Sequence, residues 1–174
     1  MTHSLAPTEL RAPAPHRVAV SRPLVLLAED DPAFRRLLHE ALEEQGLEVL
    51  PAQDVGSLLD LLGSVALGLL PMPDLLLTDQ RLPGGTGLEV LAELRRSGWS
   101  LPCVLITAFG DRALHARAEA LRAVSLDKPL DVEALASTLR SALRGQGGTG
   151  LVGRGEDLDW PFPAQLDLPT GESA

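Results

Sequence analysis

Short apolar runs alternate with stretches of helical periodicity through the middle of this chain. The first run is LVLLA at 24–28, and the stretch 32–46 that follows carries apolar residues at helical spacing up to Gly46. The same alternation then recurs, with predicted strands at 47–52, 74–78, 103–107 and 123–127 and predicted helices at 55–67, 87–98, 111–122 and 132–144. Five strands that alternate with five helices predict an α/β domain, in which a parallel sheet is covered by helices on both faces.

The two ends of the chain lack this periodicity. Residues 1–22 are rich in Ala and Pro, and residues 145–174 open with GQGGTG and continue as an acidic, Pro-containing segment. Both compositions are typical of disordered tails, so we expect one domain at 23–144 with a tail on either side. We also expect no DNA-binding output domain, because thirty Gly-rich acidic residues cannot build one.

Composition narrows the class of protein further. With 174 residues, of which 45% are hydrophobic, the chain can bury one ordinary core. A net charge of −9 argues against a nucleic-acid surface, which needs clustered cations. The longest apolar stretch is broken by Gly and Pro, and the N-terminus shows no secretory signal, so we expect no membrane span and a cytoplasmic location. The single cysteine, Cys103, lies in an apolar run and is predicted to be a small buried hydrophobe.

Polar residues follow four of the five predicted strands. Glu29 and Asp30 follow the first strand, Asp79 the third, Thr107 ends the fourth, and Lys128 comes after the fifth. In an open parallel sheet these carboxyl ends meet at one edge, where ligands bind. Clustered carboxylates need a counterion, and oxygen ligands suit Mg²⁺, which also keeps water positions for a phosphate. Lys128 is the only lysine among 15 Lys and Arg residues, and its compact ammonium group can reach phosphate oxygens.

Four segments, in this order, carry a family resemblance: VLLAEDDPAFRRLL, LLLTDQRLPGGTGLEVL, VLITAFGD and LDKPLD. Together they resemble the receiver domain of two-component response regulators, over about residues 22–144. The resemblance implies a doubly wound, flavodoxin-like sheet of five parallel strands in the order 2-1-3-4-5. It also implies a signalling protein whose only chemistry is its own phosphorylation and dephosphorylation, and not an enzyme that turns over an external substrate.

The resemblance assigns the phosphoryl acceptor and the metal ligands. Asp79 matches the aspartate that takes a phosphoryl group from a histidine kinase, a histidine phosphotransfer protein or a small phosphodonor. Glu29 and Asp30 match the acidic pair that holds Mg²⁺, with Asp30 as the direct ligand and Glu29 acting through water. Arg81 matches the residue that lends its backbone carbonyl to the metal.

The resemblance also assigns the groups that contact the phosphoryl oxygens. Thr107 matches the switch hydroxyl, and the backbone N–H of Ala108 is expected to face the phosphoryl group. Lys128 matches the lysine that pairs with it, and the Lys128–Pro129 peptide bond is expected to be cis. Phe109 stands where the family controls the access of water, so its ring predicts a long-lived phosphoryl state.

Three departures from the family pattern keep other functions open. Ser125 stands where receivers commonly carry Tyr or Phe, the segment before Asp74 is a few residues long, and the stretch from Thr107 to Lys128 is slightly short. A degenerate receiver that binds a protein without phosphate is therefore the main alternative. A phosphatase of the haloacid dehalogenase type ranks last, because Arg81 stands where that family has its second Asp. The downstream partner is unknown, and a homodimer stays open because this family commonly forms dimers through its fourth and fifth helices.

The remaining candidates have structural interpretations. Asp31 is predicted to be a solvated acid in the first turn of a helix, and PGGTG at 83–87 is predicted to be a turn, because it lacks the Lys-Ser/Thr ending of a P-loop. The histidines show no ligand spacing and are each predicted to be surface imidazoles; they are His3, His16, His39 and His115.

Overall fold

The computed structural model describes residues 22–144, so the predicted tails lie outside the described residues apart from Arg22. The described part contains seven strands and five helices. In chain order they are β1 (Leu24–Ala28), α1 (Pro32–Glu44), β2 (Glu48–Ala52), α2 (Val55–Ala66), β3 (Leu75–Asp79), β4 (Arg81–Leu82), β5 (Gly85–Thr86), α3 (Gly87–Arg96), β6 (Cys103–Thr107), α4 (Arg112–Ala120), β7 (Ala123–Asp127) and α5 (Val132–Arg144).

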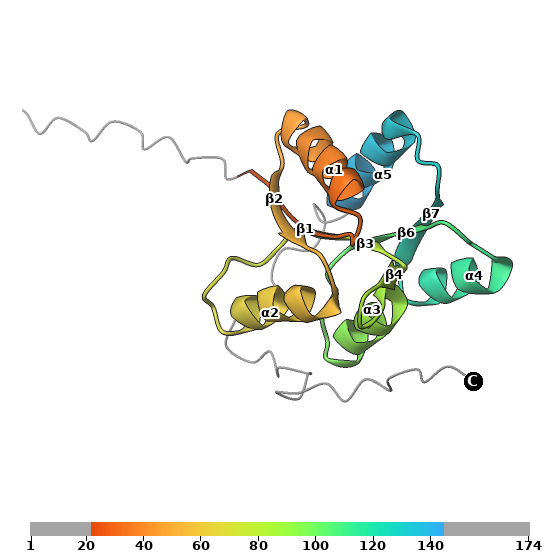
Figure 1. Ribbon diagram of the computed structural model, residues 1–174. Helices are drawn as coiled ribbons and strands as arrows, with labels where there is room; N and C mark the ends of the chain where they lie inside the picture. Colours follow the sequence, from red (N-terminus) through yellow and green to blue (C-terminus); the bar gives the residue numbers. More distant parts are fainter. Residues whose placement is uncertain (1–21, 145–174) are drawn as a thin grey trace, which may run out of the picture.

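The five longer strands form one parallel sheet in the order β2-β1-β3-β6-β7 (Figure 1). This is the predicted doubly wound order, 2-1-3-4-5 when the five strands are counted along the chain. The order reverses direction at β1, which lies between β2 and β3. The two short strands, β4 and β5, form a separate antiparallel pair around Pro83 and Gly84, so the predicted turn at 83–87 forms part of a small hairpin.

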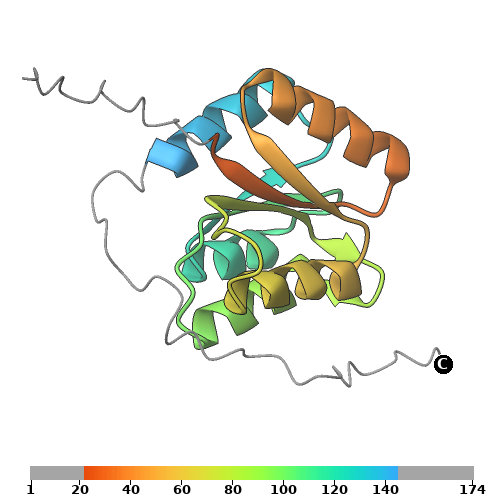
Figure 2. The same cartoon turned by 90° about the vertical axis from the view of Figure 1, so that its left-hand side faces the viewer.

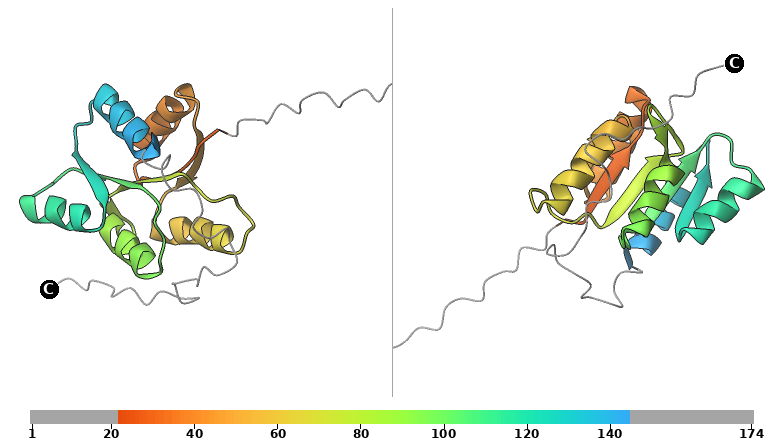
Figure 3. Two further views of the ribbon diagram at one scale, coloured as in Figure 1. Left: turned by 180° about the vertical axis from the view of Figure 1, so that it is seen from behind. Right: turned by 90° about the horizontal axis from the view of Figure 1, so that it is seen from below.

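The helices cover the sheet as two layers. Helices α1 and α5 lie on one face, and α2, α3 and α4 lie on the other (Figures 1 and 2). Viewed from below, α2, α3 and α4 lie in a row across their face (Figure 3). Alternate residues of β1 supply the two cores: Val25 and Leu27 pack towards α1 and α5, whereas Leu26 and Ala28 pack towards the other helices. Burial on both faces explains the continuous apolar runs of the inner strands β1, β3 and β6.

Side-chain caps fix where four helices begin, and these starts lie at the carboxyl edge of the strands. Asp31 precedes α1 and accepts a hydrogen bond from the backbone N–H of Phe34 at 2.7 Å, so it is the N-cap and not, as predicted, a first-turn residue. Asp54 and Thr86 form capping boxes at α2 and α3, and Asp111 caps α4.

The long connection between α2 and β3, residues 67–74, leaves apolar side chains in solvent. Leu67 and Leu69 are 76% and 74% exposed, and Met72 is also exposed. This is the segment that the sequence marks as longer than usual. None of the helices within residues 22–144 combines the length and hydropathy needed to cross a membrane.

Arg95 joins the end of α3 to the end of α4 through three hydrogen bonds to backbone carbonyls. Its guanidinium nitrogens donate to Leu121, Trp99 and Leu101 at 2.8, 2.9 and 2.8 Å. Burial lowers the pKa of Arg95 below its usual range. Cys103 is buried nearby, as predicted, and its burial raises the pKa of the thiol to about 12, which keeps it protonated and unreactive.

Candidate functional site

Four parallel strands bring polar side chains together at one edge of the sheet. Glu29 directly follows β1, Asp79 is the last residue of β3, Thr107 is the last of β6, and Lys128 directly follows β7. The register of the sheet sets these positions, because Asp79 lies opposite Ile106 on the neighbouring strand. Glu29, Asp79 and Thr107 are all buried, although polar side chains are rarely buried without partners.

Lys128 is the partner of two of these buried carboxylates. Its Nζ donates to Asp79 Oδ2 at 2.5 Å and to Glu29 Oε2 at 3.0 Å. The same Nζ lies 4.5 Å from the centroid of the Phe34 ring, which flanks it from α1. The ammonium group is therefore held between two carboxylates and one aromatic face.

The pKa values of Glu29 and Lys128 are both raised, but for different reasons. Burial raises the pKa of Glu29, and this outweighs the opposing hydrogen bonds from Lys128 and the Asp31 backbone. Burial on its own lowers the pKa of Lys128, but the hydrogen bonds and charges of Asp79 and Glu29 outweigh it, so the pKa of Lys128 is raised. Lys128 is thus a fixed positive charge at neutral pH.

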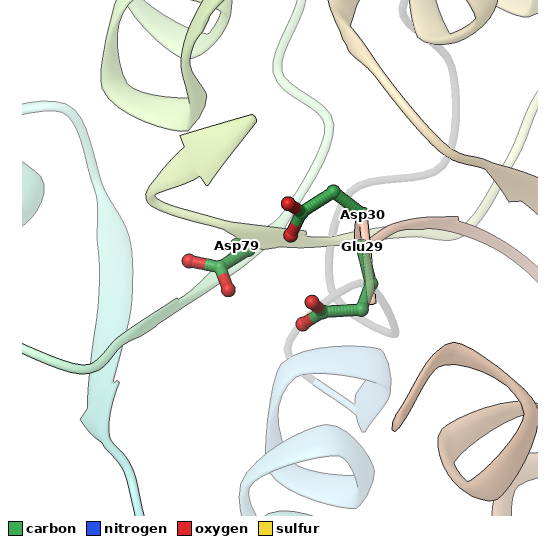
Figure 4. Close-up of side chains that lie close together, drawn as sticks. All are labelled: Glu29, Asp30 and Asp79. Carbon is green, nitrogen blue, oxygen red and sulfur yellow. The ribbon is translucent and has the colours of Figure 1, made fainter. Parts of the chain in front are cut away.

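Three carboxylates converge beside this lysine. One ligand atom from each of Glu29, Asp30 and Asp79 lies within 4.8 Å of the other two, and their carboxylates gather at the ends of β1 and β3 (Figure 4). Asp30 is exposed, whereas Glu29 and Asp79 are buried. Such a group of oxygen ligands can hold a divalent cation.

The residues that follow Asp79 and Thr107 meet across the mouth of the site. The backbone N–H of Arg81 donates to Asp79 Oδ1 at 3.0 Å, and its guanidinium carbon lies 5.3 Å from the centroid of the Phe109 ring. Phe109 is 73% exposed, and its backbone N–H donates to the Thr107 hydroxyl oxygen at 3.2 Å. Ala108 is exposed between them. Arg81 and Phe109 are 28 positions apart in the sequence, and only the fold brings them into contact.

Residues 25–140 match the response regulator receiver domain family. The chain belongs to this family. The match covers more than half of the chain, and it includes all of the strands that bring side chains to the site.

Two curated relatives of this receiver illustrate how much of a longer protein it resembles. The response regulator protein PilR of Pseudomonas aeruginosa is 33% identical over 128 residues, which make up 72% of this chain and 27% of PilR. The transcriptional regulatory protein FixJ of Azorhizobium caulinodans is 34% identical over 134 residues, 76% of this chain and 59% of FixJ. The chain thus spans between about a quarter and three fifths of these relatives.

A solved structure of a two-component response regulator from Clostridium difficile resembles this receiver with a TM-score of 0.65. The similarity covers 73% of this chain and 100% of the other, at 21% sequence identity. At that identity the likeness concerns the fold, and it agrees with the strand order described above.

Behind Asp79, the receiver leaves no room for a side chain at Gly87. A Cβ atom there would lie 2.6 Å from the Asp79 carbonyl oxygen, 2.7 Å from Leu105 Cδ1 and 3.0 Å from Thr78 Cγ2. Gly87 is the first residue of α3, so this glycine lets the helix start directly against the strand that carries Asp79. In the sequence Gly87 stands only as the last residue of the predicted turn PGGTG, and nothing there indicates that it packs against Asp79.

Two further residues near the site have contacts that the sequence does not indicate. Phe34 belongs to the helical pattern at 32–46, and nothing in the local sequence pairs it with Lys128 across 94 positions. His115 was predicted to be a surface imidazole, but it is half-buried and its Nδ1 lies 2.6 Å from Ser125 Oγ. Its side chain is still 34% exposed at the surface, but the sequence does not indicate its contact with Ser125. His39 is also half-buried and lies 3.4 Å from Glu43, while His3 and His16 lie outside the described residues.

Proposed function

We propose that Asp79 accepts a phosphoryl group from a histidine kinase or a histidine phosphotransfer protein, and that the receiver then signals through contacts with another protein. The observation that carries this proposal is the position of Lys128 Nζ, at 2.5 Å from Asp79 and 3.0 Å from Glu29. A carboxylate nucleophile with an ammonium group already beside it needs little reorganisation when negative charge develops.

The transfer needs one bond to form and one to break. A carboxylate oxygen of Asp79 forms a bond to phosphorus while the phosphorus–nitrogen bond of the donor's phosphohistidine breaks. The electron pair of that bond stays on the imidazole nitrogen, which takes up a proton. Lys128 balances the charge on the phosphoryl oxygens, and the Thr107 hydroxyl and the Ala108 backbone N–H are the proposed hydrogen-bond donors to them. Attack by water on the acyl phosphate later returns the carboxylate and inorganic phosphate.

We assign the metal position to Mg²⁺, because the three side chains that converge there offer carboxylate oxygens. Asp30 and Asp79 are the proposed direct ligands, with the backbone carbonyl of Arg81. Glu29 is proposed to act through water, as the family resemblance implies, and its Oε2 and Oε1 accept hydrogen bonds from Lys128 and from the backbone N–H of Asp31. Bound Mg²⁺ supplies further neutralisation of the phosphoryl charge.

The proposed output is contact with a downstream protein whose identity is open. The curated relatives include transcriptional regulatory proteins, and this chain spans only part of each. A net charge of −9 disfavours direct contact between this receiver and nucleic acid, so we propose that it acts on a protein target. The cytoplasmic location and the homodimer stay predictions.

The alternative is a degenerate receiver that binds its partner without phosphate. One observation favours it. Ser125 stands in place of the usual aromatic residue and is hydrogen-bonded to His115, so this position has no aromatic ring that could move together with Thr107. The phosphatase hypothesis ranks below both. The second position after Asp79 is Arg81, whose side chain lies over Phe109 and supplies no carboxylate.

Intact mass spectrometry separates these functions. The receiver is incubated with Mg²⁺ and acetyl phosphate, beside Asp79→Asn and Lys128→Arg. We expect one added phosphoryl group on the wild type, none on Asp79→Asn and less on Lys128→Arg. A wild type that gains no mass, even from a kinase that phosphorylates other receivers, would favour the degenerate receiver. Steady release of phosphate from a generic phosphomonoester would favour the phosphatase.

A further inference from the structure

His115 links helix α4 to strand β7 at the place where this receiver lacks an aromatic ring. Its Nδ1 lies 2.6 Å from Ser125 Oγ, and its Nε2 lies 3.4 Å from Asp127 Oδ1. Ser125 and Asp127 are two residues apart on one strand, so both side chains project from the same face, towards α4. We call His115, Ser125 and Asp127 the α4 latch.

The loop between β6 and α4 is packed directly on this latch. A Cβ atom at Gly110 would overlap Asp127 Oδ1 and would lie 2.5 Å from His115 Nε2. Gly110 therefore lies against the histidine–carboxylate pair with no space between them. The same loop carries Ala108 and Phe109, which lie next to the phosphoryl-accepting site.

The latch is also adjacent to the site through the backbone. Asp127 lies opposite Thr107 in the register of β6 and β7, and the Lys128 backbone N–H donates to the Thr107 carbonyl at 2.7 Å. In this state the Thr107 hydroxyl oxygen accepts from the backbone N–H of Phe109. The backbone N–H of Ala108, a proposed donor to a phosphoryl group on Asp79, belongs to the same loop, so the position of the loop sets whether that N–H reaches the phosphoryl oxygens. Through Gly110 the loop rests on the latch.

We propose that the α4 latch holds the β6–α4 loop in its resting position, and that its opening lets the loop close over the phosphoryl group. His115 and Ser125 are thus positioning residues for the proposed phosphoryl transfer, and the inference rests on that function. The latch couples the site to α4 by hydrogen bonds, in a receiver whose β7 offers no aromatic ring for the purpose. Releasing it shifts the population of the loop towards the closed form.

The first test measures the latch without any phosphodonor. Amide hydrogen exchange is compared between wild type, Ser125→Ala and His115→Ala. Loss of the hydrogen bond is expected to speed exchange of residues 108–111 by about fivefold, with α1 and α5 unchanged. Ser125→Thr keeps the hydroxyl and is expected to exchange like the wild type. Glu119→Ala, at an exposed position of the same helix, is the control for a general effect on α4.

The second test measures phosphoryl uptake from acetyl phosphate in the same variants by intact mass. Release of the latch is expected to raise the initial rate by about threefold in Ser125→Ala and His115→Ala, with Ser125→Thr restoring the wild-type rate. A latch that only stabilised the fold would lower the melting temperature without speeding uptake.

The outcomes keep the two proposals distinguishable. Exchange at 108–111 that matches the wild type in both alanine variants overturns the latch, whatever the phosphorylation result. Faster exchange with an unchanged or lower rate of uptake overturns the positioning role of His115 and Ser125. A wild type that takes up no phosphoryl group overturns the proposed function, while the exchange result still decides whether the latch holds the loop.

Discussion

Replacing Gly87 by alanine tests how tightly the strand that carries Asp79 is packed. The added Cβ would lie 2.6 Å from the Asp79 carbonyl oxygen and 2.7 Å from a methyl carbon of Leu105. Favourable carbon–carbon contacts lie at roughly 3.5 Å or more, so the methyl overlap is about 0.8 Å. The Leu105 methyl can shift, but the carbonyl belongs to the central strand of the sheet and cannot move alone.

The expected cost follows from these contacts. Overpacking a rigid site costs about 1–3 kcal/mol, and the backbone contact places Gly87→Ala near the upper end. Gly87 does not have a positive φ, so alanine also stabilises by about 0.4–1 kcal/mol through a less flexible unfolded chain. The net loss in the free energy of unfolding is therefore about 2 kcal/mol.

Urea unfolding followed by far-UV circular dichroism measures this loss. With a slope of about 1–3 kcal/mol per M, the midpoint should fall by about 1 M. Gly56→Ala is the matched control, because Gly56 also lies in the first turn of a helix, and its Cβ would meet only Asp54 Oδ1, at an ordinary 3.4 Å. It should leave the midpoint unchanged or raise it slightly.

The steric reasoning fails if Gly87→Ala unfolds at the same urea concentration as the wild type. That result would mean that the start of α3 can move away from β3 at no cost. Slower phosphoryl uptake by a folded Gly87→Ala protein is the second expected result, because the added methyl group displaces the backbone of Asp79 itself.

Four further predictions use the same measurements. Asp54→Ala should lose about 1 kcal/mol of stability at pH 7; the backbone and side-chain hydrogen bonds of Ser57 lower the pKa of Asp54, so the difference should vanish as the pH falls below the ordinary 3.8. The hydrogen bonds and charges of Asp79 and Glu29 outweigh burial and raise the pKa of Lys128, so the lysine's contribution to stability is complete below pH 10.5. The melting temperature should fall as the pH rises above that value in the wild type and not in Lys128→Met. Mg²⁺ should raise the melting temperature of the wild type but not of Asp30→Asn. Phe109→Ala should shorten the lifetime of the phosphoryl adduct by about threefold in a mass time course, and an unchanged half-life would contradict the proposed screening of water.

The strands could be predicted from the sequence because a sheet covered on both faces needs consecutive apolar residues. Leu75, Leu76 and Leu77 of β3 are all fully buried, and β1 and β6 show the same kind of uninterrupted buried apolar run. The predicted end of that strand was one residue early. Pairing with β6 continues through Asp79, which lies opposite Ile106, so hydrogen bonding between strands extends the element beyond its apolar run.

The neighbours at the edge of the sheet could be predicted for the same reason, since parallel strands end together. The α4 latch could not. Its bond joins His115 on a helix to Ser125 on a strand, and neither residue has a periodic or spaced partner in the sequence. From the sequence, Ser125 indicates only that the aromatic side chain common at this position of receivers is absent. The contact that replaces the ring depends on how closely α4 packs on β7, which hydrophobic patterns do not encode.

The charges at the site explain why a single lysine and a metal position belong together. Glu29, Asp30 and Asp79 carry three negative charges and Lys128 one positive charge, so these four side chains sum to −2. One divalent cation balances that remainder. Phosphorylation of Asp79 replaces one carboxylate charge by a phosphoryl group of about −2, so the need for both cations grows as the reaction proceeds. An arginine in place of Lys128 keeps the charge, but its planar fork must fit between two buried carboxylates and the Phe34 ring. Lower phosphoryl uptake by Lys128→Arg at equal charge would therefore show that the shape of the cation, and not its charge alone, sets the reactivity of Asp79.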